Sequence, residues 1–471
     1  MTCDIIIHGG YVVTMQGLGT GIIPNGAVAV KGNKIQAVGN TAEIMKAYSA
    51  HRYIDAKGKA ILPGLIDCHM HTSNAIAKGA AQDLKEGQWM FYGILPVLSC
   101  ATDEDLRRGS MLNILDSLLS GTTTFCDYDI PMLEIVKNHI QLKTRAIVSD
   151  LINEMPSDTT GVVPSKPYDF DYARGAAKLA ANEKLVNEYH MSNNGRIMCR
   201  YGPQAADMCS VEYLKEVKRL ADRDKVGIYV HVEQMADEQL QTEARTGKRP
   251  VDLLNELGYF GPDTMVAHMT FSTPREVEIV AKSGASLAVC PGNNTFPPGE
   301  LFRSFGGRIA LGSDQAPINC RNMFGVMKLA AERQKYCTKD PAAWPAWQVL
   351  RFATIESARA LNVDHLIGSL EVGKLADIII IDLNTPSLAP IYEFPIRNII
   401  PNLVYGARGN EVETVIIDGN VVVDERKVIG VDVAEEIRLA NESAKRFSDE
   451  IVKKPWAASL PLSVYTAEGK Y

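Results

Sequence analysis

The sequence predicts an α/β fold: a (β/α)8 barrel of the TIM type that carries a small composite β-sandwich formed by the N- and C-terminal segments. Three observations lead to this prediction. Apolar, strand-like runs alternate with helical patterns over residues 61–362. Short strands with tight turns fill residues 1–60 and 363–430. A tail with helical texture follows over residues 431–471.

The two β-rich ends are expected to pair with each other. At the N-terminal end, the strand-like runs are Asp4–Val13, Gly26–Val30 and Ile35–Val38. At the C-terminal end they are Ala376–Asp382, Val412–Ile417 and Val421–Val423, with an Asp-Gly turn before the last one. A few strands alone bury too little surface to be stable, so we expect both ends to form one unit.

Eight strand-like runs are expected in the middle of the chain, with helices after most of them. The expected strands are 61–71, 121–127, 144–150, 196–201, 226–233, 265–268, 286–290 and 308–313. The clearest helical patterns are 103–119, 211–222, 250–257 and 274–283. Eight βα repeats over about 300 residues are typical of a (β/α)8 barrel.

Composition narrows the class of protein. Hydrophobic residues make up 46% and charged residues 22%, which is ordinary for a soluble globular protein. A net charge of -7 without a long basic run argues against a nucleic-acid partner. The nine cysteines include no C-x-x-C pair, which argues against a disulfide framework. No apolar run is long enough to span a membrane and the start lacks a signal-peptide pattern, so we expect a cytoplasmic protein.

Histidines and an aspartate stand where four of the expected strands end. The first strand ends in His69 and His71, whose i, i+2 spacing puts both rings on one face. One such pair is close to what chance gives for nine histidines. The fifth strand adds His231, the sixth His268 and the eighth Asp314. Because reactive groups of barrel enzymes gather at the C-terminal ends of the strands, together they indicate a metal site.

Several of these runs resemble signatures of the amidohydrolase superfamily. The run from Pro63 to His71 (PGLIDCHMH) is similar to its first-strand signature. The runs 266–268 (VAH) and 311–314 (LGSD) resemble its sixth- and eighth-strand signatures. The runs 202–214, 368–377 and 409–419 resemble the branch of chlorohydrolases and aminohydrolases that contains triazine hydrolases, melamine deaminase and methylthioadenosine/adenosylhomocysteine deaminases.

The resemblance implies a site for one divalent metal ion. His69, His71, His231 and Asp314 would hold it. Zn²⁺ suits such ligands best, and Fe²⁺ or Mn²⁺ would also accept them. Binuclear relatives need a bridging lysine or glutamate on the third or fourth strand, and here neither strand carries a suitable lysine. His268 would orient or deprotonate the attacking water, and Asp314 could also accept its proton.

The acid and the substrate residues depart from the family pattern. Relatives place a glutamate three residues after the fifth-strand histidine, where this chain has Gln234. Glu233, one residue earlier, is the favoured proton donor, since an i+2 residue would share the face of His231 if the strand continues. Glu233 as a merely structural carboxylate and Glu238 as the donor stay open. The expected substrate-binding residues are Gln88, Trp89, Gln204, Gln234 and Asn294. Asp127 and Asp129 follow the second strand and could face a cationic substrate.

These features predict a metal-dependent hydrolase that removes an amino group from a C=N carbon. The expected substrate is a small nitrogen-rich compound such as an aminopurine or pyrimidine, an s-triazine, or a guanidine or guanylurea. A dechlorinating hydrolase acting on a triazine-like ring is a second possibility, and a non-catalytic scaffold of the same fold is a third. The resemblance also implies a homodimer or a larger homo-oligomer.

Overall fold

The computed structural model describes residues 1–84, 89–159, 162–163, 166–293, 296–315 and 322–471. Two parallel sheets form its centre. One has the strand order β14-β6-β7-β8-β9 and the other β10-β11-β12-β13. The strands are β6 (Leu65–His71), β7 (Thr122–Asp129), β8 (Arg145–Asp150), β9 (Ile197–Cys199), β10 (Ile228–Val232), β11 (Thr264–His268), β12 (Ser286–Val289), β13 (Arg308–Leu311) and β14 (Asp314–Gln315). Seven of the eight strands expected in the middle of the chain are thus confirmed to within a few residues, whereas the first, expected over 61–71, is divided at Gly64, and only Leu65–His71 lies in a parallel sheet.

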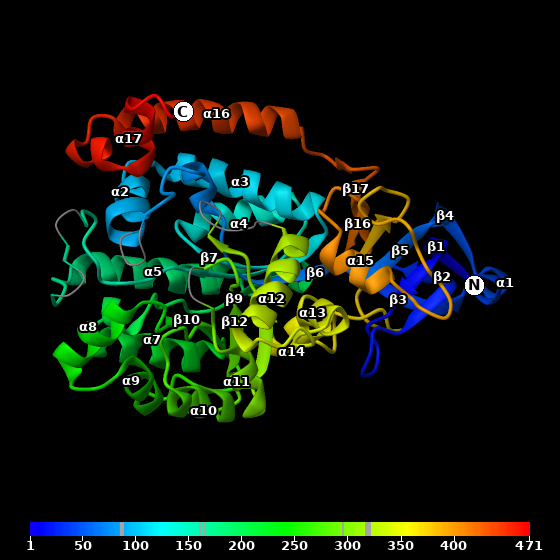
Figure 1. Ribbon diagram of the computed structural model, residues 1–471, viewed down its shortest axis with the longest axis horizontal. Coiled ribbons are helices and arrows are strands. Elements are labelled where there is room, and N and C mark those ends of the chain that lie inside the picture. The colour runs from blue at the N-terminus through cyan, green and yellow to red at the C-terminus, as the bar shows by residue number, and fades with distance from the viewer. Residues whose placement is uncertain (85–88, 160–161, 164–165, 294–295, 316–321) are drawn as a thin grey trace.

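Helices follow these strands, as the βα alternation predicts (Figure 1). The longer ones are α3 (Asp103–Leu119), α4 (Met132–Gln141), α5 (Tyr172–Tyr189), α7 (Val211–Asp224), α8 (Ala236–Thr246), α9 (Pro250–Glu256), α10 (Pro274–Lys282), α12 (Met323–Thr338), α13 (Ala346–Phe352) and α14 (Ile355–Ala360). Local sequence explains their starts. Thr102 and Asp105 form a capping box at α3, and Thr273 and Glu276 form another at α10.

The strands contribute one face to a shared interior. Side chains from different strands pack into one buried cluster, among them Ile66, Cys126, Ile147, Tyr229, Met265, Ala288 and Ala310. The opposite faces pack against the surrounding helices in a larger cluster. Strands buried on both faces explain why their sequences are apolar almost throughout rather than alternating.

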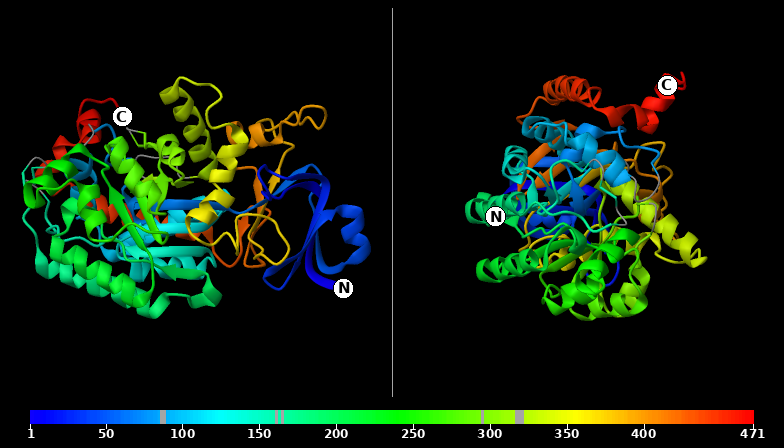
Figure 2. Two further views of the ribbon diagram at one scale, coloured as in Figure 1. Left: turned by 90° about the horizontal axis from the view of Figure 1, so that it is seen from below. Right: turned by 90° about the vertical axis from the view of Figure 1, so that its left-hand side faces the viewer.

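The two ends of the chain meet in one nine-stranded sheet. Its order is β18-β17-β16-β15-β5-β1-β2-β3, and β4 pairs with β1. The strands are β1 (Thr2–Val13), β2 (Ile22–Lys31), β3 (Lys34–Asn40), β4 (Ser49–Asp55), β5 (Lys59–Pro63), β15 (Ile378–Asp382), β16 (Val412–Ile417), β17 (Asn420–Asp424) and β18 (Lys427–Val428). The junction is the antiparallel pairing of β5 with β15, where Ile61 faces Ile380. Figure 2 shows this sheet at one end of the molecule.

The C-terminal tail folds back over the parallel sheets. Helix α16 (Val433–Ile451) lies along α3 (Figure 1), where Arg108 pairs with Glu436 and Asp105 with Arg446. The helix covers the first part of the tail for which the sequence predicts helical structure and ends at Ile451. None of the helices in the described ranges combines the length and apolar composition needed to cross a bilayer.

Candidate active site

Four imidazoles and one carboxylate converge where the parallel strands end. His69 and His71 close β6, His231 lies in β10, His268 closes β11 and Asp314 begins β14. Each of the five is at most 5% exposed. The ligand atoms of His69, His71 and His231 lie within 4.8 Å of one another, and the same holds for His69, His268 and Asp314. These are the residues that the strand-end pattern singles out.

The distances inside this strand-end cluster are short. The Oδ1 atom of Asp314 lies 3.3 Å from Nε2 of His69 and 3.4 Å from Nε2 of His71. The Nε2 atoms of His71 and His231 are 3.4 Å apart. The ring of His268 stacks on that of His231, with centroids 5.2 Å apart.

Hydrogen bonds to main-chain carbonyls fix which ring nitrogens face each other. Nδ1 of His71 contacts the carbonyl of Tyr128, and Nδ1 of His231 donates to the carbonyl of Gln204 at 2.8 Å. A carbonyl oxygen can only accept, so in the neutral rings both Nδ1 atoms carry the proton and both Nε2 atoms present a lone pair. Two lone pairs that face each other across 3.4 Å repel. A cation between them would turn the repulsion into attraction.

Unpartnered atoms of the cluster support the same conclusion. Among the described residues, Nε2 of His69, Nε2 of His268 and both carboxylate oxygens of Asp314 are buried without a hydrogen-bond partner. Each such atom costs about 1–3 kcal/mol when nothing binds it. Burial lowers the pKa of His268 to about 3 and holds that of His231 well below its usual value. Neutral imidazoles and a carboxylate are the ligands that Zn²⁺ prefers, so the residues fit a divalent metal ion.

The backbone around the cluster is bent in an uncommon way. His268 and Asp314 have φ angles of 78° and 61°, a region that residues other than glycine seldom adopt. At Gly312, just before Asp314, an added Cβ would lie 2.7 Å from Cβ of His69. Only glycine therefore lets the chain after β13 pass this close to β6. Backbone conformations of this kind gather at functional sites.

A second layer of contacts holds the ligand side chains in place. The hydroxyl of Tyr229 donates to the carbonyl of Cys68 and lies 3.1 Å from Nδ1 of His69. Asp67 accepts hydrogen bonds from the backbone nitrogens of Ser313 at 3.0 Å and His69 at 3.3 Å. These contacts tie β6 to β10 and to the turn before β14.

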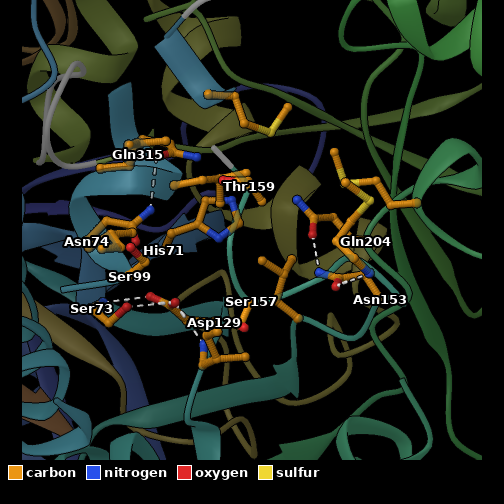
Figure 3. A pocket seen from close by; sticks show the side chains of 18 of the residues that line it. His71, Ser73, Asn74, Ser99, Asp129, Asn153, Ser157, Thr159, Gln204 and Gln315 are labelled. Atoms are coloured by element: carbon orange, nitrogen blue, oxygen red, sulfur yellow. Dashed lines mark hydrogen bonds between the residues drawn. The ribbon is translucent and has the colours of Figure 1, made fainter. Parts of the chain in front are cut away.

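A cavity of about 300 Å³ opens next to the cluster, and His71 and His231 form part of its wall. Figure 3 shows labelled side chains that line it. Its apolar wall comes from the segment around Trp89, and its polar groups include Asp129, Gln204 and Gln234. This volume suits a small organic molecule.

Three of the five expected substrate residues, Trp89, Gln204 and Gln234, line the cavity. Gln88 and Asn294 lie outside the described residues. Gln204 does more than face the cavity. Its side-chain oxygen accepts from Asn153, while its backbone carbonyl orients His231.

Glu233 does not take the position expected of a proton donor. Strand β10 ends at Val232 and Glu233 has a φ of 49°, so the i+2 alternation with His231 does not continue. The Glu233 carboxylate is fully buried 3.3 Å from Arg249, a residue that also binds Glu276. It is absent from the described lining of the cavity, whereas Gln234 is present. The expectation that Glu233 shares the inward face of His231 is therefore wrong.

Sequence reasoning missed several polar residues of the cavity wall, among them Asn153, Arg174 and Lys178. Arg174 and Lys178 lie one turn apart on α5, and Asn153 follows β8. The Lys178 ammonium donates to Oδ1 of Asn153 at 2.9 Å, and Arg174 donates to the carbonyl of Met155 at 2.8 Å. Their i, i+4 spacing was the only available signal, and it is common on helices.

Comparison with known proteins agrees with a metal-binding site of this kind. The Amidohydrolase family model matches residues 60–422. The chain is 33% identical to a 5'-deoxyadenosine deaminase of Methanosarcina mazei, over 96% of this chain and 99% of that protein. It is also 33% identical to a 5-methylthioadenosine/S-adenosylhomocysteine deaminase of Thermoanaerobacter pseudethanolicus, over 90% and 95%.

A solved structure extends the similarity to three dimensions. The crystal structure of an adenosine deaminase from Xanthomonas campestris with bound zinc superposes with a TM-score of 0.85 at 26% identity, over 95% of this chain and 99% of that one. The resemblance inferred from the strand-end signatures is thus confirmed along nearly the whole sequence. The chain belongs to the amidohydrolase family.

Proposed function

We propose that this protein hydrolyses a C–N bond at an amino-substituted C=N carbon of an aminopurine-like compound and releases ammonia. The observation that carries the proposal is the strand-end cluster, whose unpartnered ligand atoms lie beside a cavity of substrate size. The relatives support it, because the two reported above are deaminases of adenosine-type compounds. The intact cluster argues against a non-catalytic scaffold, which has no chemical reason to keep such costly groups.

One divalent ion, most suitably Zn²⁺, would be held by His69, His71, His231 and Asp314. When bound, the ion would lower the pKa of a water molecule so that the nucleophile is available near neutral pH. His268 stays neutral because burial disfavours its charge, so it can accept a proton from that water. Asp314 would pass a proton to the departing amino group. Trp89, Gln204 and Gln234 would orient the substrate from the cavity wall.

We also propose how the sheets close, how the chain divides into domains and how it assembles. We infer that the two parallel sheets close into one (β/α)8 barrel within residues 61–362, of which 61–63 belong to β5 of the nine-stranded sheet. A parallel bridge between Tyr201 and Ile228 supports this at one seam, and the pairing of β14 with β6 supports it at the other. Segments 1–60 and 363–430 would then form the β-sandwich, with 431–471 as the tail. The exposed Phe394 and Ile396 suit a surface that a second copy covers in a cytoplasmic homodimer or larger homo-oligomer.

The test is ammonia release from a panel of small nitrogen-rich compounds. The panel contains adenosine, 5'-deoxyadenosine, an amino-s-triazine, guanylurea and a chloro-s-triazine. We expect stoichiometric ammonia from at least one aminopurine. A chelator should abolish the release and added Zn²⁺ should restore it. If the chloro-s-triazine releases chloride and no member of the panel releases ammonia, the proposed deaminase function is contradicted.

A further inference from the structure

Removal of an amino group from a C=N carbon requires an acid in the site. As the nucleophile adds to the carbon, the neighbouring nitrogen gains electron density and must be protonated. Gln234 occupies the place where the family resemblance implies that acid, and an amide cannot supply a proton in this way. Another group must therefore take over this role.

Most carboxyl groups near the cluster are absent from the described lining of the cavity. Glu233 is bound to Arg249 outside the cavity. Glu238 accepts from the backbone nitrogen of Gln234 and does not reach the described lining. Asp127 accepts from the hydroxyl of Thr72 and contacts His139. Asp314 lies between His69 and His71.

Asp129 is the one carboxyl group in the described lining of the cavity. It ends β7, next to β6, and Figure 3 shows it together with His71 and Ser73. Its carboxylate accepts from the backbone nitrogen of Ser73 at 2.6 Å, the hydroxyl of Ser73 at 2.7 Å and the backbone nitrogen of Ile130 at 2.8 Å. Because Ser73 follows His71 by two residues, these bonds fix the carboxyl group beside the strand-end cluster.

Its surroundings make Asp129 more basic than an ordinary aspartate. Burial, assisted by the charge of Asp127, raises its pKa to about 7, although the charge of His71 and the hydrogen bond from Ser73 act in the opposite direction. This agrees with the position of the group but is secondary to it.

We propose that Asp129, acting within the function proposed above, is the acid that protonates the substrate nitrogen next to the attacked carbon. The oxygen of water forms a bond to carbon while that nitrogen takes the proton of Asp129. The bond from carbon to the amino group then breaks. Of the two protons that water loses, one leaves with the amino group as ammonia and the other restores the carboxyl group of Asp129. The acid thus lies on the second strand instead of after the fifth.

Asp150 offers a matched control. It is the cross-strand partner of Asp129, at the end of β8, and it is also buried. Its carboxylate accepts from the backbone nitrogen of Met132 at 3.0 Å and is absent from the described lining. Asp150→Asn therefore removes a neighbouring buried carboxyl group that is not part of the described cavity lining.

The experiment measures kcat and KM of the zinc-loaded wild type, Asp129→Asn and Asp150→Asn, together with metal content and melting temperature. Two substrates are compared: an aminopurine that releases ammonia in the panel assay and its 6-chloro analogue. The chloro compound has a more electrophilic carbon, so addition of the nucleophile to it depends less on protonation of the neighbouring nitrogen. We expect Asp129→Asn to lower kcat for the amino compound by about 10²–10⁴-fold, with KM little changed and a loss at least tenfold smaller for the chloro compound. Asp150→Asn should keep both rates within about threefold.

Equal losses for both substrates would assign Asp129 a structural role and overturn the proposal. So would a kcat for the amino compound within about threefold of wild type, or an equal loss in Asp150→Asn. If Asp129→Asn does not fold, Asp129→Glu is the variant to measure. It keeps a carboxyl group at this position but displaces it by the length of one methylene group. A lower amino-to-chloro rate ratio would support the proposal and an unchanged ratio would overturn it. A wild type that releases no ammonia from any aminopurine would instead refute the proposed function, and this assignment with it.

Discussion

His69 and His71 lie at the end of a strand, where His71 also lines the cavity, whereas Arg174 and Lys178 reach the cavity from a helix. The histidines are fixed by hydrogen bonds from their own ring nitrogens and by the tight passage at Gly312. The two cations make single contacts to an amide oxygen and a carbonyl, and neither has an ion pair among the described residues. The strand-end cluster is thus held firmly in a geometry suited to one ion, whereas the cavity wall carries two positive charges that are only partly compensated.

The largest effect should follow from removing a ligand of the cluster. His231→Ala should lose the bound metal ion and at least about 10³-fold in kcat, because activation of water depends on the ion. Metal analysis and ammonia release measure the two losses. His365→Ala, at an exposed position, is the control and should retain both. Full activity of His231→Ala would remove the cluster from the mechanism.

A smaller effect should follow from loosening the cluster without removing a ligand. Tyr229→Phe deletes the hydroxyl that contacts Cys68 and His69. Loss of such an outer contact typically weakens metal binding about 10–100-fold. Competition with a chelator measures the affinity, and Tyr336→Phe at the surface is the control. An unchanged affinity would mean that the ligands need no support from β10.

A substitution in the cavity wall should change the stability of the protein rather than its affinity for the metal ion. Burial lowers the pKa of Lys178 from 10.5 to about 7. Below pH 7 the lysine is charged in both states, so the folded state bears the full cost of burying the charge. The cost fades as pH rises from 7 towards 10.5, because the folded protein then holds a neutral amine. Lys178→Met should therefore raise the melting temperature more at pH 6 than at pH 9.5.

The control for this prediction is Lys184→Met, farther along the same helix, where the ammonium is exposed and lies 3.9 Å from Glu188. Thermal melts at both pH values should show little change for it. A gain for Lys178→Met that is equal at both pH values would show that burial of charge is not its cause.

The smallest effect is expected at Glu233. Glu233→Gln should leave kcat within about threefold of wild type, since the carboxylate faces Arg249 and not the cavity. Steady-state ammonia release checks this. A loss of a hundredfold or more with normal metal content would return Glu233 to the role of proton donor.

The two regions also differ in how far the sequence predicts them. Strand ends of parallel sheets meet at one edge, so His69, His71, His231, His268 and Asp314 could be grouped from their positions alone. The pairing of the two chain ends through β5 and β15 followed from their small size.

The wall was less predictable because its residues come from loops and a helix. The placement of Glu233 failed since a left-handed φ at the strand end cannot be read from alternation. Asn153, Arg174 and Lys178 carried no specific signal, because a polar residue on a loop or helix is usually solvated and an i, i+4 pair is common on helices. Strand β4 (Ser49–Asp55) could not be predicted for a related reason. Much of it is exposed, so its sequence lacks an apolar pattern.

The most direct test of the account is a titration of the metal-free protein with Zn²⁺, with ammonia release from an active aminopurine measured at each step. The account predicts that activity rises linearly and levels off at one ion per chain, because His69, His71, His231 and Asp314 would together hold a single ion. A plateau at two ions per chain, or full activity in the metal-free protein, would contradict it.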